Sequence, residues 1–319
     1  MLEIFKKVFK SRLFRLFFSI VLIYFAFKKV DVVELFRQVR NVPVWFVLVN
    51  ILITFLTLVL ISIRWSLLLF PKIKIKTILT FTRANFLATF YSLFFSTAVV
   101  GEFAKWIVVD DKYPEMAKTK VLGSVFLDRF IGFSVFIFLG LVSAIIGKNQ
   151  GLVVPEMIFY LLIVLNVICL IIYVIIYFFD ASKLLPRFTW LQKLDEAFEL
   201  FKENKIQIIK CFLVSILSEM FWILQIWFVG RQFGVGLSFL AVFTFIPVIS
   251  LILVLPISIG GFGPREQLYL LFFSQFGRSE SILLMSTFLG ILGVINSLCG
   301  GILLFFDQET REKISKPTP

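Results

Sequence analysis

The sequence predicts an all-α polytopic membrane protein, with about seven to eight transmembrane helices and two re-entrant, broken helical elements. Hydrophobic residues make up 60% and charged residues 16% of the 319 residues, against about 45–50% and about 25% in soluble domains. Apolar runs of about 20 residues recur along the chain, each long enough to cross a hydrocarbon core of about 30 Å. The alternating pattern of a transmembrane β-barrel is absent from the sequence.

The apolar runs give the expected transmembrane spans in chain order. These are Leu13–Phe27, Val44–Ile63, Val121–Ile146, Leu152–Phe179, Ile206–Val229, Leu237–Leu255 and Ile282–Phe306. Two further apolar segments, Ile78–Trp106 and Pro256–Phe276, are interrupted by small or polar residues. No small-residue cleavage site follows the first run, so we expect a retained span and not a signal peptide.

The polar segments are too short to form a second domain, so we expect one integral membrane domain over residues 1–319. Residues 1–12 are a basic N-terminus, expected in the cytoplasm, and residues 307–319 are a polar tail. Residues 28–43 and 180–205 mix charges with Leu, Val and Phe in the pattern of amphipathic helices that lie in the membrane interface.

The basic residues predict the orientation. Lys and Arg outnumber Asp and Glu by 32 to 20, and they crowd before the first span, after the second, and in residues 101–120 and 180–205. The loops after the third and fifth spans hold only Lys148 and Arg231. Cytoplasmic loops carry such an excess, and it favours anionic lipid head groups. Segment Ile78–Trp106 must then enter and leave on the cytoplasmic side.

The same rule leaves the C-terminal tail open. Its residues Arg311, Lys313 and Lys316 favour the cytoplasm, but this span count places them outside. Either segment Pro256–Phe276 supplies an extra crossing or the tail is an exception. The basic residues form no separate domain, so we expect no nucleic-acid partner.

Composition also restricts the chemistry. The chain has no histidine, which excludes histidine-based catalysis, metal sites and proton relays. Its cysteines, Cys169, Cys211 and Cys299, lie in hydrophobic runs without metal-binding spacing, and we expect them to be packing residues. We expect neither a metal nor a cofactor.

The second interrupted segment contains PISIGGFGPREQ, which begins at Pro256. Gly260, Gly261 and Gly263 permit backbone conformations that residues with a Cβ avoid. Pro264 suits the first turn of a helix, which places Arg265 and Glu266 in that turn. Free backbone N–H groups beside a guanidinium favour a phosphate. The alternative is a tight turn with the Arg-Glu pair at the membrane interface.

The first interrupted segment contains STAVVGEFAKW, which begins at Ser96. After Gly101, residues Glu102 and Lys105 are spaced i,i+3 and share one helical face. The alternative is a surface ion pair at a helix end. Irregular backbone at membrane depth survives where protein buries it or water reaches it, and transporters use such breaks at their binding sites.

Asp128 and Arg129 lie about 10 Å into the third span. Each charge costs about 2.5–3.5 kcal/mol there, so such residues usually pair and face a cavity. Adjacent side chains point about 100° apart on a helix, so we expect each to have a different partner. The alternative is a snorkelling pair near the cytoplasmic interface.

Other polar residues have simpler interpretations. We expect Arg64 and Trp65 at the end of the second span to be an interfacial anchor. Asp110 and Asp111 are expected to be solvated acids and not a metal-binding pair. Glu219, a deep carboxylate, is either a coupling site for a proton or cation or a structural hydrogen-bonding group.

Together these elements resemble the lysylphosphatidylglycerol synthase transmembrane region family, also called the flippase-like domain family. The resemblance rests on Arg64-Trp65, the Gly-Glu-x-x-basic element Gly101–Lys105, the Asp128-Arg129 step and the P-x-S-x-G-G-x-G-x-R-E element Pro256–Glu266. It extends roughly from Val30 to Phe306. Relatives often carry a proline before the Gly-Glu element, and STAVVGE has none.

The resemblance implies a stand-alone member, without the soluble synthase domain, in a prokaryotic cell membrane. It implies a non-enzymatic flippase or scramblase for a polar-headed lipid, either an anionic phospholipid or a polyprenyl-phosphate-linked glycolipid. Gly101, Glu102, Lys105, Asp128, Arg129, Gly260, Gly261, Gly263, Arg265 and Glu266 would then form the lipid site, with Glu219 for coupling. The alternatives are an integral membrane enzyme of lipid metabolism that uses Asp110, Asp111 or Asp128, and a non-catalytic partner of a separately encoded lipid synthase.

Overall fold

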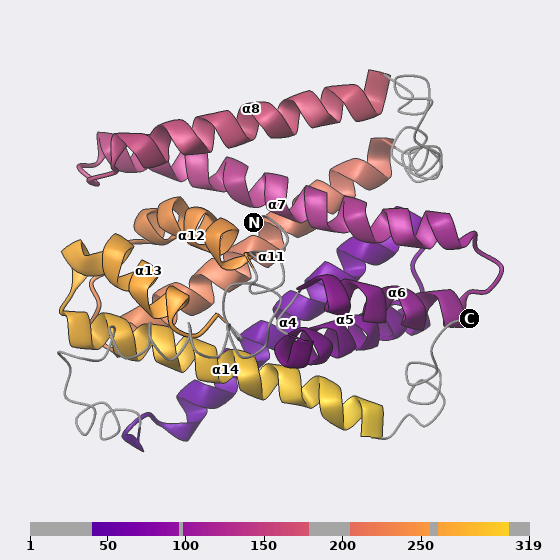
Figure 1. Ribbon diagram of the computed structural model, residues 1–319, viewed down its shortest axis with the longest axis horizontal. Helices are drawn as coiled ribbons and strands as arrows, with labels where there is room; N and C mark the ends of the chain where they lie inside the picture. The colour runs from indigo at the N-terminus through magenta and orange to yellow at the C-terminus, as the bar shows by residue number, and fades with distance from the viewer. Residues whose placement is uncertain (1–39, 96–97, 179–204, 256–260, 306–319) are drawn as a thin grey trace, which may run out of the picture.

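The computed structural model describes residues 40–95, 98–178, 205–255 and 261–305 (Figure 1). These residues form helices joined by short turns and contain no strand, so the all-α prediction is confirmed for them. The predicted first span, most of both amphipathic linkers, the C-terminal tail and Gly260 lie outside the described residues.

In the described part of the chain, five helices are long and apolar enough to cross a membrane. They confirm the corresponding predicted spans and extend most of them by a few residues. They are α4 (Val44–Leu69), α7 (Lys118–Asn149), α8 (Glu156–Phe178), α11 (Lys205–Gln232) and α14 (Ser279–Phe305). Helix α7 has 32 residues and is therefore about 48 Å long.

Helices α4 and α11 pack closely in the middle of the bundle, and α8 lies on the outside against α7 (Figure 1). Phe46 of α4 is fully buried, with its ring centroid 4.7 Å from that of Phe228 of α11. Gln225 Nε2 of α11 donates to the carbonyl oxygen of Asn50 at 3.1 Å. Such contacts between facing polar groups are typical of helix pairs in membranes.

The first interrupted segment forms a helical hairpin, α5 (Ile75–Phe95) and α6 (Ala98–Lys112), whose helices lie side by side (Figure 1). Its open end is marked by Phe70 and Tyr113, whose ring centroids are 5.0 Å apart. A Cβ on Gly101 of α6 would overlap Ser92 Oγ and the Ala88 carbonyl of α5. Only glycine permits this close approach of the two helices.

The second interrupted segment completes another hairpin with the helix before it. Helix α12 (Phe239–Leu253) is followed by a turn, α13 (Pro264–Phe273) and the 3-10 turn η1 (Ser274–Phe276). The open end is closed by a hydrogen bond from Gly236 N–H to the Phe276 carbonyl oxygen at 2.8 Å. Helix α12 has 15 residues, so its length of about 22 Å is too short for the predicted span Leu237–Leu255.

The two hairpins enter the bundle from opposite ends of α7 (Figure 1). At the N-terminal end of α7, Lys118 Nζ lies 3.9 Å from Asp110 of α6. Beyond the C-terminal end of α7, Gln275 Nε2 of η1 donates to the Val153 carbonyl oxygen at 3.3 Å. The tips of both hairpins therefore point toward the middle of the molecule.

The described helices bear on the alternatives that the span count left open for the segment Pro256–Phe276. The second hairpin returns to the end from which it started, so α12 is not a crossing by itself. Helix α14 then runs to the end that carries the open side of the α5–α6 hairpin (Figure 1). Lys72, Lys74 and Lys76 are at that end, and the C-terminal tail lies outside the described residues.

Candidate functional site

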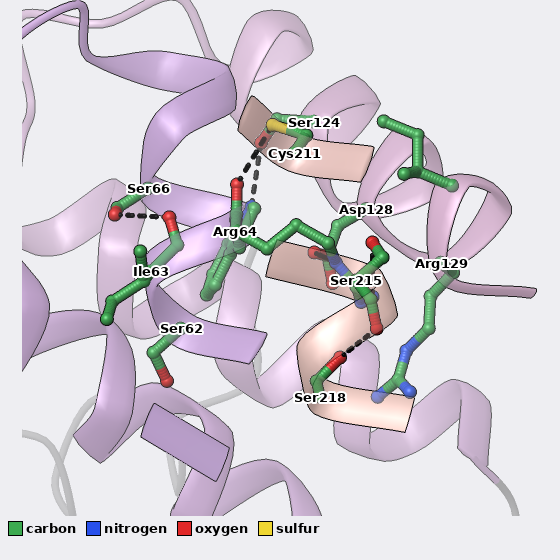
Figure 2. Close-up of polar contacts among 12 residues, drawn as sticks. Ser62, Ile63, Arg64, Ser66, Ser124, Asp128, Arg129, Cys211, Ser215 and Ser218 are labelled. Carbon is green, nitrogen blue, oxygen red and sulfur yellow. Dashed lines mark hydrogen bonds and ion pairs between the residues drawn. The ribbon is translucent and has the colours of Figure 1, made fainter. Parts of the chain in front are cut away.

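Asp128 is the centre of a buried charge network. Its side chain is 0% exposed, and Oδ1 accepts a hydrogen bond from Arg64 Nε of α4 at 2.7 Å. Its other oxygen, Oδ2, lies 3.4 Å from Lys105 Nζ of α6. Figure 2 shows the Arg64 side chain reaching toward Asp128, with Arg129 extending away from that pair.

The network continues from Lys105 to Arg129. Lys105 Nζ lies 2.9 Å from Glu102 Oε2 and 4.6 Å from the centroid of the Trp65 ring. Glu102 Oε1 accepts a hydrogen bond from Arg129 Nε at 2.6 Å and also pairs with the Arg129 Nη2 group. Positive and negative side chains therefore alternate across α4, α7 and α6.

The prediction that Asp128 and Arg129 have different partners is confirmed, because Asp128 pairs with Arg64 and Lys105 while Arg129 pairs with Glu102. The interpretation of Arg64 and Trp65 as an interfacial anchor is wrong. Their exposed fractions are 3% and 0%, and Trp65 Nε1 donates to Ser124 Oγ of α7 at 3.0 Å. Helix α4 continues to Leu69, which leaves both side chains inside the bundle.

The glycine-rich turn has the backbone that its sequence predicts. Gly261 and Gly263 have φ values of 77° and 91°, in the left-handed region where residues with a Cβ are strained. Pro264 is the first residue of α13. Glu266 Oε2 accepts a hydrogen bond from the Gly263 N–H at 2.6 Å, so this amide is used to cap α13.

Glu266 also binds the neighbouring charge. Its Oε1 lies 3.1 Å from Arg265 Nη2 and 3.4 Å from Ser286 Oγ of α14. The Arg265 guanidinium stands over the Phe262 ring at 4.7 Å. Arg265 Nε is buried and has no hydrogen-bond partner among the described residues.

Arg129 and Arg265 both line one cavity of about 290 Å³. Arg129 exposes 55% of its side chain and Arg265 13%. The rest of the lining comes from α5 and α14, namely Ala88, Thr89, Ser92, Leu93, Gly290, Gly293, Val294 and Ser297. Two guanidiniums and three hydroxyl groups thus meet near the tips of the two hairpins.

The other predicted site residues in the described part of the chain do not line this cavity. Glu102, Lys105 and Asp128 hold Arg129 in the charge network, and Glu266 holds Arg265. Gly101 allows the two helices of the first hairpin to pack closely against each other. The sequence analysis did not predict Ser297 or the glycines of α14 as site residues. The sequence signal for the glycines was the short spacing of Gly290 and Gly293 inside an apolar span.

A family model of the lysylphosphatidylglycerol synthase TM region matches residues 12–292. The chain belongs to this family. No curated protein and no solved structure matches the chain. The match includes every element on which the resemblance rested. As a member of this lipid-associated membrane family, the protein is a multi-pass membrane protein.

Glu219 of α11 lies one helical turn from a residue that contacts the charge network. That residue is Ser215, whose hydroxyl accepts from Arg64 Nη1 at 3.2 Å. Glu219 interacts electrostatically with Arg64, Arg129 and Asp128. It forms no ion pair with any described residue.

Two of the acids considered for an enzyme, Asp128 and Asp110, form ion pairs with basic residues. Asp128 uses both of its oxygens in the charge network. Asp110 lies at the open end of the first hairpin, near Lys118. The described residues contain no group of three Cys, Asp or Glu side chains that is arranged to hold a metal ion.

Proposed function

We propose that this protein is a non-enzymatic lipid transporter, a flippase or scramblase that moves a lipid with a phosphate-bearing head group across a cell membrane. The observation that carries the proposal is the shared cavity of Arg129 and Arg265. An arginine at membrane depth is expensive and usually faces a functional cavity. Membership of a lipid-associated membrane family supports the same class of substrate.

The chemistry of the cavity suits a phosphate. A planar guanidinium offers paired N–H donors that match phosphate oxygens. Arg265 Nε is already an unused donor, and the hydroxyls of Thr89, Ser92 and Ser297 line the same space. A ligand between the two arginines would receive donors from α7 and from α13.

The size of the cavity suits a head group better than a whole lipid. Its volume of about 290 Å³ is at the low end of the range for small-molecule pockets. We infer that the head group, a phospholipid phosphate or the phosphate of a polyprenyl-linked glycolipid, enters the cavity. The acyl or prenyl tails stay in the hydrocarbon core, where they lose no hydrophobic stabilisation.

The two hairpins, which enter the bundle from opposite ends, provide a route for the head group. Residues of α5 in the first hairpin line the cavity, and so does Arg265 of α13 in the second. Movement of one hairpin at a time would open the cavity to one side at a time, as broken helices do in transporters. By the positive-inside rule, the lysine-rich end with α5 and α6 is cytoplasmic.

A reconstitution assay tests the proposal. The full chain is placed in vesicles that contain a fluorescent phosphatidylglycerol, a fluorescent phosphatidylethanolamine or an uncharged fluorescent glycolipid, each labelled on its head group. A membrane-impermeant quencher then reports how fast the inner label reaches the outer leaflet. We expect faster exchange than in protein-free vesicles for phosphate-bearing lipids and not for the uncharged one. Equal exchange with and without protein for every lipid would disprove the proposal.

A further inference from the structure

The two arginines of the cavity differ in how far they reach the surface. More than half of the Arg129 side chain is exposed, whereas Arg265 is largely buried and its Nε has no hydrogen-bond partner among the described residues. Arg129 therefore lies at the mouth of the cavity and Arg265 at its inner end. A head group that enters the cavity meets Arg129 first.

Arg129 is exposed on a part of α7 whose other exposed residues are apolar. Helix α7 begins at Lys118, so Arg129 lies about 16 Å along its axis. Within residues 121–146, Arg129 is the single charged residue that is exposed, and the others are Phe126, Phe138, Ile145 and Ile146. The apolar surface of a spanning helix faces hydrocarbon, and a charge at such a depth usually faces a cavity.

From these positions we propose that the lipid enters the cavity sideways from the bilayer, where α6 meets α7, and that Phe103 and Phe126 contact its tail next to the head group. The proposal rests on the cavity's proposed function as a phosphate site. Phe103 of α6 is half-exposed and follows Glu102, which pairs with Arg129. Phe126 is exposed and lies one turn before Arg129, on the same side of α7. An exposed aromatic ring thus stands on each of the two helices that meet at Arg129.

The chemistry of a phosphate-bearing lipid suits this arrangement. Its charge lies where the head group joins the tail, so a phosphate at Arg129 brings the first tail carbons next to the neighbouring side chains. In hydrocarbon the rings gain no hydrophobic energy from a tail, but close packing provides dispersion attraction and fixes its orientation. Arg129 would then supply the attraction, and the two rings would set the direction from which the tail approaches. A free phosphate would use Arg129 without either ring.

Photo-crosslinking tests this entry site. The photoreactive amino acid benzoylphenylalanine replaces Phe103 or Phe126 in the full chain, which is purified in detergent and given head-group-labelled phosphatidylglycerol. The matched control is the same replacement at Phe138. This residue is on the same helix and is 54% exposed, against 62% for Phe126. Its position in the sequence places it about 180° around α7 from Arg129.

The expected result is labelling that depends on the arginine. Labelling at Phe103 and Phe126 should fall by about tenfold or more in Arg129→Gln, because a hydrogen bond to a charged group contributes this much to affinity. Labelling at Phe138 should be weaker and should stay the same in Arg129→Gln. Unlabelled phosphatidylglycerol should compete for labelling at Phe126. Glycerol phosphate at the same concentration should not, because it lacks the tail.

Equal labelling at Phe126 and Phe138, or labelling at Phe126 that is unchanged in Arg129→Gln, would overturn the entry site. Competition by glycerol phosphate as strong as that by phosphatidylglycerol would overturn the tail contact and favour a free phosphate as the ligand. In either case, protein-dependent exchange in the vesicle assay would leave the phosphate cavity standing. Loss of both labelling and exchange would overturn the cavity's function and the entry site together. If Arg129→Gln fails to fold, the comparison of Phe126 with Phe138 and the competition in the otherwise unchanged chain still decide.

Discussion

Arg129 and Arg265 come from different elements of the bundle, α7 and the tip of a hairpin, yet both line the same cavity. Arg129 is held by Glu102 at the first hairpin, and Arg265 by Glu266 at the start of α13. Each hairpin thus supplies a carboxylate that positions one guanidinium. Because the hairpins enter from opposite ends, movement of one hairpin would change the contacts of one arginine and leave the other arginine in place.

Asp128 should be needed for folding. The change Asp128→Asn keeps the shape of the side chain but leaves the buried charges of Arg64 and Lys105 without their shared partner. Breaking such a buried pair costs about 3–5 kcal/mol. We expect a large drop in thermal stability in detergent, measured by the loss of monodisperse protein on heating.

The matched control for that change is Asp110→Asn. Asp110 faces Lys118, whose side chain is 77% exposed, and exposed pairs contribute about 0–1 kcal/mol. We expect little change in melting temperature. Equal stability of the two variants would contradict the structural role of the network.

The hairpins should give a distinctive labelling pattern in whole cells. In a chain without native cysteines, Lys74→Cys and Lys118→Cys flank the first hairpin, while Arg231→Cys and Arg278→Cys flank the second. All four positions are exposed. A membrane-impermeant thiol reagent should label the latter pair from outside and the former pair only after the cells are opened. Labelling of the two members of either pair from different sides would show that the segment between them crosses the membrane.

Gly101 should contribute to stability by allowing close packing of α5 and α6. An added methyl group in Gly101→Ala would meet Ser92 Oγ and the Ala88 backbone carbonyl, and the backbone cannot move aside cheaply. Overpacking of this kind costs about 1–3 kcal/mol. We expect a lower melting temperature for the purified protein. Unchanged stability with weakened lipid binding would instead favour a direct contact between Gly101 and the lipid.

Much of this site could be predicted from sequence because its signals are local. The α13 start at Pro264, the left-handed glycines and the need for separate partners of Asp128 and Arg129 all follow from short-range chemistry. The hairpin shape of Ile78–Trp106 followed from the basic residues on both of its sides. Its entry into and exit from the membrane on one side stays a prediction that the labelling experiment tests.

What the sequence did not predict depends on contacts between distant residues. Arg64 pairs with Asp128, 64 positions later in the chain, so its place at the end of an apolar run was misread as an interfacial anchor. Helix α12 is apolar enough for a span, but its hydrogen-bonded closure through Gly236 and Phe276 turns it into half of a hairpin. Neither contact has a signature in local periodicity.

The most direct test of the transport account is head-group exchange in vesicles by a pair of α14 glycine variants. In Gly290→Ala the new methyl group would overlap the Arg265 guanidinium and push this flexible side chain out of position. In Gly293→Ala, on the same cavity wall, the methyl group would meet nothing within 4 Å. Because a hydrogen bond to a charged group contributes about 1.5–3 kcal/mol, we expect Gly290→Ala and Arg265→Gln to slow exchange by about tenfold to about a hundredfold. Gly293→Ala should stay near the wild-type rate. Wild-type exchange rates in folded Gly290→Ala and Arg265→Gln proteins would contradict the account, because lipid would then cross without this arginine.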